Sequence, residues 1–207
     1  MATEMVEAPA PVFRHPLGLP AGSVRAVLSL MIAVQFWLLL LLPAEKNATV
    51  PIYLYMLVGL ILLFFAAHGH SIAPAGAPHP WHLPRGTFRW LILLGSVVIV
   101  GWRWYADPEL LQKRLTPDAE QLWEWPFLLL SLVGGFILGW LAHHGPWRNY
   151  PWFQDIQAWL SLIAMILLAV DILWRVFINP NLEQSMRFSE WECGLVAIVS
   201  LYFGIRA

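Results

Sequence analysis

Six long apolar runs constrain the fold of this chain more than any other feature of its sequence. A helix needs about 20 apolar residues to cross a hydrocarbon core about 30 Å thick, and lipid offers no partner to the backbone amides of an open strand. The sequence therefore predicts an all-α, polytopic integral membrane protein with about six transmembrane helices. The runs cover residues 23–43, 50–69, 88–105, 123–143, 156–178 and 191–205.

Composition agrees with a membrane protein. Hydrophobic residues make up 59% of the chain and charged residues 12%, and the mean hydropathy is +0.63. Soluble proteins average about 25% charged residues, so a soluble globular class is excluded. We expect a Pro/Ala-rich tail at the membrane surface over residues 1–22, followed by a single transmembrane domain over residues 23–207.

The runs pair in order as three helical hairpins, over residues 23–70, 88–144 and 156–206. The segment Val24 to Leu30 shares four identities with the segment Ile156 to Leu162. Repeated hairpins of this kind stack pseudo-symmetrically, so an internal repeat is one interpretation. The alternative is that Leu-rich spans resemble one another by chance.

All seven histidines fall at the same end of the predicted spans, so a six-helix arrangement gathers them on one side of the bilayer. Imidazole is a common ligand for transition metals, and a haem needs one histidine from each of two facing helices, for which His68 and His143 are the best pair. The other interpretation is that these side chains sit at helix C-termini, where an imidazolium meets the negative end of the helix dipole. The candidate metal or haem ligands are His68, His70, His79, His82, His143 and His144.

Asp171 and Arg175 lie four residues apart in the fifth run, hence on one face of a helix. An ionisable pair inside a membrane span is a functional candidate by default. Both residues are close to the end of the run, so a structural ion pair is the interpretation that we favour. Arg103, Glu190 and Glu192 lie at a similar depth and are candidates to join the pair.

Small residues indicate where helices touch. Ser131, Gly135 and Gly139 recur every four residues in the fourth run, which lets another backbone approach closely along that stripe. Gly194, Ala197 and Gly204 are candidates for the same role in the last run. We expect the first stripe to take part in assembly of an oligomer.

The two ends of the transmembrane domain carry short motifs, Gly22-Ser23-Val24-Arg25-Ala26-Val27-Leu28 and Tyr202-Phe203-Gly204-Ile205-Arg206. They resemble the two ends of small bacterial and phage hairpin membrane proteins of holin-like type. In those proteins a Gly-Ser/Asn-x-Arg-Ala start and a Tyr-Phe-Gly end bracket two spans, whereas here they bracket six. The resemblance implies a bacterial membrane protein and no established activity.

Charge gives little information on orientation, because Lys and Arg are divided six and six between the two sides. Arg25 and Arg89 lie at helix starts, and on that ground we expect the N-terminus to be cytoplasmic in a bacterial inner membrane.

The sequence carries no phosphate loop, nucleophile elbow or dinucleotide fingerprint, and no basic stripe that would suggest nucleic acid. We therefore expect a non-enzymatic structural or assembly subunit, in a homo-oligomer or beside other membrane subunits. Two alternatives stay open: a metal- or haem-binding redox subunit that uses the histidines, and a holin-like pore former. We expect the protein to hold no cofactor; the alternative is that it binds a metal ion or a haem.

Overall fold

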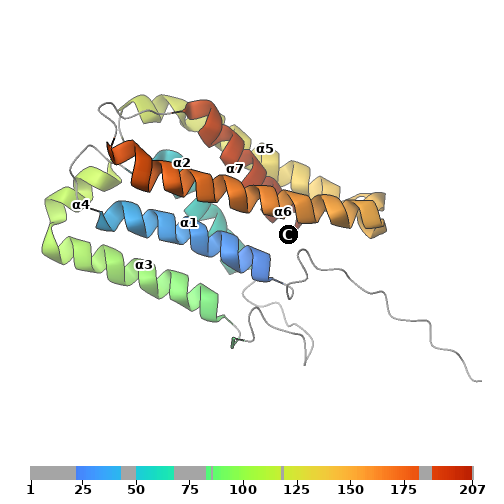
Figure 1. Cartoon of the computed structure of the whole chain (residues 1–207), viewed down its shortest axis with the longest axis horizontal. Helices are drawn as coiled ribbons and strands as arrows, with labels where there is room; N and C mark the ends of the chain where they lie inside the picture. Colours follow the sequence, from blue (N-terminus) through green and yellow to red (C-terminus); the bar gives the residue numbers. More distant parts are fainter. Residues whose placement is uncertain are drawn as a thin grey trace, which may run out of the picture.

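A computed structural model describes residues 22–42, 50–67, 83–84, 86–117, 119–181 and 188–206 as a bundle of helices (Figure 1). No strand occurs among these residues, so the predicted all-α class is confirmed. The α-helices are α1 (Ser23–Leu41), α2 (Ile52–Ala67), α3 (Thr87–Ala106), α4 (Pro108–Leu115), α5 (Ala119–His144), α6 (Pro151–Ile172) and α7 (Ser189–Ile205). Three short segments accompany them: the 3-10 helix η3 (Pro146–Asn149), the π-helix η4 (Leu173–Ile178) and the 3-10 helix η5 (Asn179–Asn181).

Four helical segments in the described chain are long and apolar enough to cross a membrane. They are Ser23–Leu41, Thr87–Ala106, Leu122–His144 and Pro151–Asn181. The two other principal helices are shorter, with 16 residues in α2 and 17 in α7. At 1.5 Å per residue these two reach only about 24 to 26 Å, less than a hydrocarbon core of about 30 Å. By length and composition, therefore, four helices rather than six meet the requirement for a span.

The two short helices form the interior of the bundle. Leu54 and Leu57 in α2 and Val196 and Val199 in α7 are fully buried, and they join residues of α1 in the main hydrophobic core. In contrast, α3 contributes a single buried residue, Ile92. The exposed apolar surface lies mainly on α3, α5 and α6, while most of α1, α2 and α7 faces the core; Leu62 and Leu63 of α2 are exposed.

The most extensive contact between two helices joins α5 to α7. A Cβ atom at Gly135 would come within 2.5 Å of the carbonyl oxygen of Ala197, and one at Gly139 within 2.8 Å of the backbone nitrogen of Ile205. From the other side, a Cβ at Gly204 would come within 3.0 Å of the backbone nitrogen of Trp140. Only glycine permits this approach, because any side chain would overlap the opposing backbone.

The stripe of Ser131, Gly135 and Gly139 therefore packs against α7 of the same chain. This corrects the expectation that the stripe takes part in assembly of an oligomer. Ser131 also lies in this contact, where its carbonyl oxygen accepts a hydrogen bond of 3.4 Å from the hydroxyl of Ser200. Of the three candidates in α7, Ala197 and Gly204 face α5, whereas a Cβ at Gly194 would meet nothing within 4 Å.

The middle hairpin of the sequence analysis, residues 88–144, does not close on itself in the described chain. Its first helix, α3, packs against α1 and α4, while its second, α5, packs against α7 and α2. In Figure 1, α3 lies along one edge of the bundle beside α1, and α5 pairs with α7 on the opposite edge. The hairpin repeat stays a prediction.

The short helix α4 was not predicted, and it ties α3 to the end of α1. Asp107 caps it by accepting a hydrogen bond of 2.9 Å from the backbone nitrogen of Leu110, and proline occupies its first position. From its last turn, Arg114 donates to the carbonyl oxygens of Leu39, at 2.8 Å, and Leu40, at 2.7 Å. Carbonyls at a helix end have no partner within the helix, so this guanidinium satisfies them.

Two further bonds complete this cap. Arg114 also donates to the carbonyl oxygen of Leu42, and Arg103 from α3 donates to that of Leu41. Burial, and then the nearby charge of Arg103, lower the pKa of the Arg114 guanidinium. The carbonyl dipoles therefore offset the cost of removing the Arg114 guanidinium from water. The same hydrogen bonds fix the relative positions of α1, α3 and α4.

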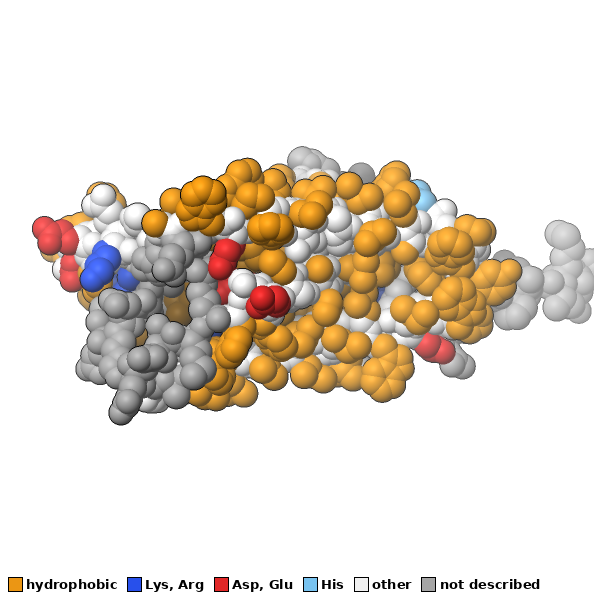
Figure 2. All heavy atoms as spheres, turned by 90° about the horizontal axis from the view of Figure 1, so that it is seen from above, with side chains coloured by type: hydrophobic (Ala, Val, Ile, Leu, Met, Phe, Trp, Pro, Cys, Tyr) orange, Lys and Arg blue, Asp and Glu red, His pale blue; other side chains and the backbone are white. Residues whose placement is uncertain are grey.

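The outer surface is predominantly apolar. Seen from above, hydrophobic side chains cover most of the described surface, and charged side chains are few (Figure 2). Large exposed hydrophobic side chains follow α3, α5 and α6, among them Val97 and Val98 of α3, Leu130 and Leu138 of α5, and Ile163 and Ile166 of α6. An apolar exterior of this extent is expected where lipid replaces water as the solvent.

Candidate functional site

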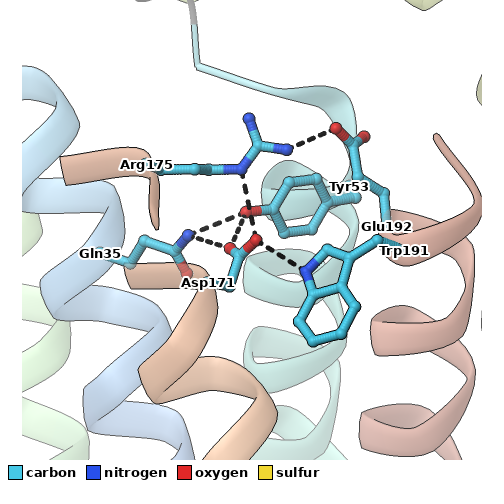
Figure 3. Close-up of polar contacts among 6 residues, drawn as sticks. All are labelled: Gln35, Tyr53, Asp171, Arg175, Trp191 and Glu192. Carbon is cyan, nitrogen blue, oxygen red and sulfur yellow. Dashed lines mark hydrogen bonds and ion pairs between the residues drawn. The ribbon is translucent and has the colours of Figure 1, made fainter. Parts of the chain in front are cut away.

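A cluster of polar side chains lies inside the bundle around the carboxylate of Asp171, the last residue but one of α6 (Figure 3). Asp171 is only 1% exposed. Its Oδ2 atom accepts hydrogen bonds from the amide of Gln35 and the hydroxyl of Tyr53, and its Oδ1 atom accepts one of 3.1 Å from the indole nitrogen of Trp191. Three neutral donors therefore surround a buried carboxylate, which is what an anion needs in a medium without water.

Arg175 places a positive charge next to this carboxylate and joins it to a second one. Its Nε atom lies 3.5 Å from Oδ1 of Asp171, and its Nη2 atom donates to Oε1 of Glu192. The guanidinium carbon also stands 4.9 Å from the centre of the Tyr53 ring, within cation–π distance. Glu192 is fully buried in the first turn of α7, where the helix dipole favours its negative charge.

Four parts of the chain, distant in sequence, supply the six residues of this cluster, which we call the Asp171 cluster. They are Gln35 from α1, Tyr53 from α2, Asp171 and Arg175 from α6 and η4, and Trp191 and Glu192 from α7. The hydrogen bond of 2.8 Å from the Gln35 amide to the Tyr53 hydroxyl links the first two helices directly. The cluster thus fixes the register of four helices.

A π-helix orients the guanidinium of Arg175, which is the cation of the cluster. The hydrogen-bonding pattern changes from α to π at Leu173, two residues after Asp171, and Arg175 lies within the π segment. Because a π turn holds more residues than an α turn, it rotates the following side chains relative to those before it. Asp171 therefore faces Gln35 and Tyr53 while Arg175 reaches Glu192. Single π turns of this kind occur frequently at functional sites.

The cluster holds two carboxylates and one guanidinium, so its formal charge is negative when all three are ionised. Dipoles offset the excess negative charge. The groups that donate hydrogen bonds to Asp171 stabilise one carboxylate, and the N-terminal end of α7 stabilises the carboxylate of Glu192. Two buried atoms of the cluster have no hydrogen-bond partner. They are Oε1 of the fully buried Gln35 and Nε of Arg175, which forms an ion pair with Asp171 at 3.5 Å but no hydrogen bond. Chemically, the arrangement stabilises charge inside an apolar bundle.

Sequence reasoning found half of this cluster. The structure brings together the predicted pair Asp171 and Arg175 and adds Glu192, which had been named as a candidate. Arg103, another candidate, instead caps the end of α1. Gln35, Tyr53 and Trp191 were missed, although a single glutamine within an apolar run is itself a signal, because an amide in a span needs a partner.

The histidine candidates are only partly described. His143 and His144 lie in the last turn of α5, with their ring centres 5.3 Å apart. Nδ1 of His144 is 2.9 Å from the carbonyl oxygen of Trp140, one turn earlier in the helix. No group of three or more His, Cys, Asp or Glu side chains suited to a metal ion occurs among the described residues. The candidates His68, His70, His79 and His82 lie outside those residues.

Comparison of the chain with protein-family models, with curated proteins and with solved structures finds no match.

Proposed function

We propose that this chain is a non-enzymatic, multi-pass membrane protein that acts as a structural or assembly subunit, in a homo-oligomer or beside other membrane subunits. The observation that carries the proposal is the internal bonding of the Asp171 cluster. Asp171 and Glu192 are both buried, and Arg175 bonds to both of them. An enzyme keeps its reacting groups open to a substrate, whereas these groups hold helices together.

The other buried guanidinium supports the same role. Arg114 directs its hydrogen bonds at carbonyl oxygens of α1, so it too stabilises the bundle rather than presenting a charge to a ligand. Polar groups used in this way give a membrane bundle one specific arrangement, since each lacks an alternative partner in lipid.

In this proposal six helices cross a bacterial inner membrane, and the N-terminus is cytoplasmic. The long segments α3, α5 and α6 to η5 present their exposed apolar side chains to lipid, while α1, α2 and α7 cross with most of their side chains facing the core. Helices shorter than the bilayer are accommodated by local thinning or by burial within a bundle, at modest cost per ångström. The exposed face of α3 is available to lipid or to a neighbouring subunit.

Native mass spectrometry of the protein, extracted gently from its own membranes, tests the proposal. A defined oligomer or a stoichiometric protein partner is the expected result. The finding that would overturn the proposal is a lone monomer in every gentle extraction. A metal or tetrapyrrole mass would instead favour the rival redox subunit, and replacing His143 by Ala would show whether that histidine holds it.

Cross-linking in the membrane gives a second measurement that does not depend on extraction. In a Cys193→Ser background, cysteine is introduced at the exposed residues Val98 or Ile166, or at the fully buried Leu168 as the matched control. We expect disulfide-linked dimers for an exposed position and none for Leu168. Equal cross-linking at all three positions would reflect random collision or unfolding and would count against a specific assembly.

A further inference from the structure

Two guanidinium groups meet at the C-terminal end of α1, where α4 and the end of α3 also lie (Figure 1). Arg114 donates to the carbonyl oxygens of Leu40, at 2.7 Å, and of Leu42. Arg103 donates to the carbonyl oxygen of Leu41, which comes between them in the chain. Because the three carbonyls are consecutive at one helix end, the two guanidinium groups are neighbours. Hydrogen bonds therefore hold two like charges at one site.

The positive charge at this site exceeds the negative charge that offsets it. The C-terminal end of a helix carries about half of an elementary negative charge, whereas each guanidinium carries a full positive one. The carboxylate of Asp107 also acts on Arg114, while it accepts a hydrogen bond from the backbone of Leu110. Among the described residues, no carboxylate forms an ion pair with Arg103 or Arg114. Even with the charge of Asp107 counted, an excess of positive charge remains to attract an anion.

Arg103 is the arginine that has donors left for a ligand. A guanidinium has five N–H donors. Within the described part of the chain Arg103 makes one hydrogen bond, whereas Arg114 makes three. The Nε atom of Arg103 is buried without a hydrogen-bond partner, although the residue as a whole is only partly buried. An unsatisfied donor on a cation is costly, and an anionic oxygen that approaches from the exposed side of Arg103 removes this cost.

Aromatic residues place Arg103 at the depth of the lipid headgroups. Trp102 and Trp104 flank it in the sequence and Tyr105 follows, with exposed fractions of 64%, 65% and 86%. Exposed Trp and Tyr side chains near the end of an apolar helix are typical of the interface between the hydrocarbon and the headgroups. The phosphate groups of membrane lipids lie in that layer, so they are the anions nearest to Arg103.

We propose that Arg103 binds a phosphate group at the end of α3, and that the positive charge of Arg114 behind it strengthens this binding. Arginine suits the ligand because its planar fork pairs with two phosphate oxygens at once. The phosphate belongs either to a phospholipid headgroup, which the depth of Arg103 favours, or to a soluble phosphate compound. The site does not depend on the assembly role proposed above.

The test measures binding to the full chain, purified in a maltoside detergent that contains no phosphate. Phosphatidylglycerol or inorganic phosphate is added in separate titrations, and native mass spectra count the bound molecules. We expect saturable binding by the unmodified chain and at least a tenfold weaker affinity in Arg103→Gln. The matched control is Arg89→Gln, because Arg89 is also partly buried and also precedes a tryptophan, but lies at the opposite end of α3. This variant should bind like the unmodified chain.

The two titrations distinguish the sources of the phosphate. Binding of phosphatidylglycerol that excess inorganic phosphate does not displace identifies a lipid site, and saturable binding of inorganic phosphate identifies a soluble ligand. No saturable binding of either, unchanged affinity in Arg103→Gln, or an equal loss in Arg89→Gln would overturn the proposal.

Arg103→Lys keeps the test valid if Arg103→Gln fails to fold. Lysine retains the charge and a donor for the carbonyl oxygen of Leu41, but it lacks the planar fork. Its affinity should be intermediate, and an affinity equal to that of the unmodified chain would contradict a site that depends on the fork.

Discussion

At the scale of single residues, Asp171 determines how the interior of this bundle is held together. It is a charged side chain within a long apolar segment, and side chains of three other helical elements converge on it as donors. A buried carboxylate is tolerated only with such partners, since removal from water costs several kcal/mol. The same donors are in turn left unsatisfied if the carboxylate is lost.

Replacing Asp171 by Asn should therefore destabilise the bundle. The amide cannot accept from all of its present donors, and Arg175 keeps only Glu192 as an anionic partner. We expect a loss of roughly 2 kcal/mol in the free energy of unfolding. Thermal or denaturant unfolding in detergent, followed by circular dichroism, measures the change.

The control is Asp155→Asn, which makes the same chemical change at an exposed position of the same helix. This variant should unfold like the unmodified chain. Equal stability of both variants would show that the Asp171 cluster does not hold the bundle together.

At the scale of elements, close backbone contact rather than chain order decides which helices pair. α5 has its most extensive contact with α7 and not with its sequence neighbour α6, because glycines on both helices allow their backbones to touch. Dispersion between closely packed atoms drives association in lipid, where burial of apolar surface contributes little. The π segment has a comparable role for α6, because it directs Arg175 toward α7.

Adding one methyl group to this contact should separate the two helices. A Cβ at Gly139 would overlap the carbonyl oxygen of Leu201 and approach the backbone of Ile205, neither of which can move as a side chain does. We expect Gly139→Ala to lower the free energy of unfolding by about 1 to 3 kcal/mol. Thermal or denaturant unfolding in detergent, followed by circular dichroism, measures this change. The neighbouring Gly134 has nothing within 4 Å of its Cβ position.

Gly134→Ala is therefore the matched control, and it should be neutral or stabilising by up to about 1 kcal/mol because alanine favours a helix. A loss of stability of the same size in both variants would mean that helix propensity, and not the α5–α7 contact, is responsible.

At the scale of the whole molecule, the exterior is predominantly apolar (Figure 2), whereas Asp171, Glu192 and Arg114 are buried, as expected of a membrane bundle. α5 is the strongest candidate to separate the two sides of the membrane. Its 26 residues extend about 39 Å, more than a hydrocarbon core. Glu109 in α4 precedes this helix, and Asp155 in α6 follows it; both are exposed.

Single cysteines at these two positions, in the Cys193→Ser background, should react with a membrane-impermeant maleimide from opposite sides. With a cytoplasmic N-terminus, Glu109→Cys is labelled in intact spheroplasts and Asp155→Cys only in inverted vesicles. A cysteine at the buried Leu168 should react from neither side. Labelling of both exposed positions from the same side would contradict a crossing by α5.

The sequence by itself determined the all-helical class and the apolar segments, because these depend on the local composition of continuous runs and on the length of a helix that crosses lipid. It also determined the pairing of Asp171 with Arg175, since residues four apart share a face of one helix. Tertiary structure decided everything that joins distant parts of the chain. The positions of Gln35, Tyr53 and Trp191 around Asp171 depend on how separate helices pack, and so does the use of Gly135 and Gly139 within the chain. Apolar runs alone do not specify that packing, because in lipid one Leu-rich surface packs nearly as well as another, and the few polar and small side chains select the arrangement.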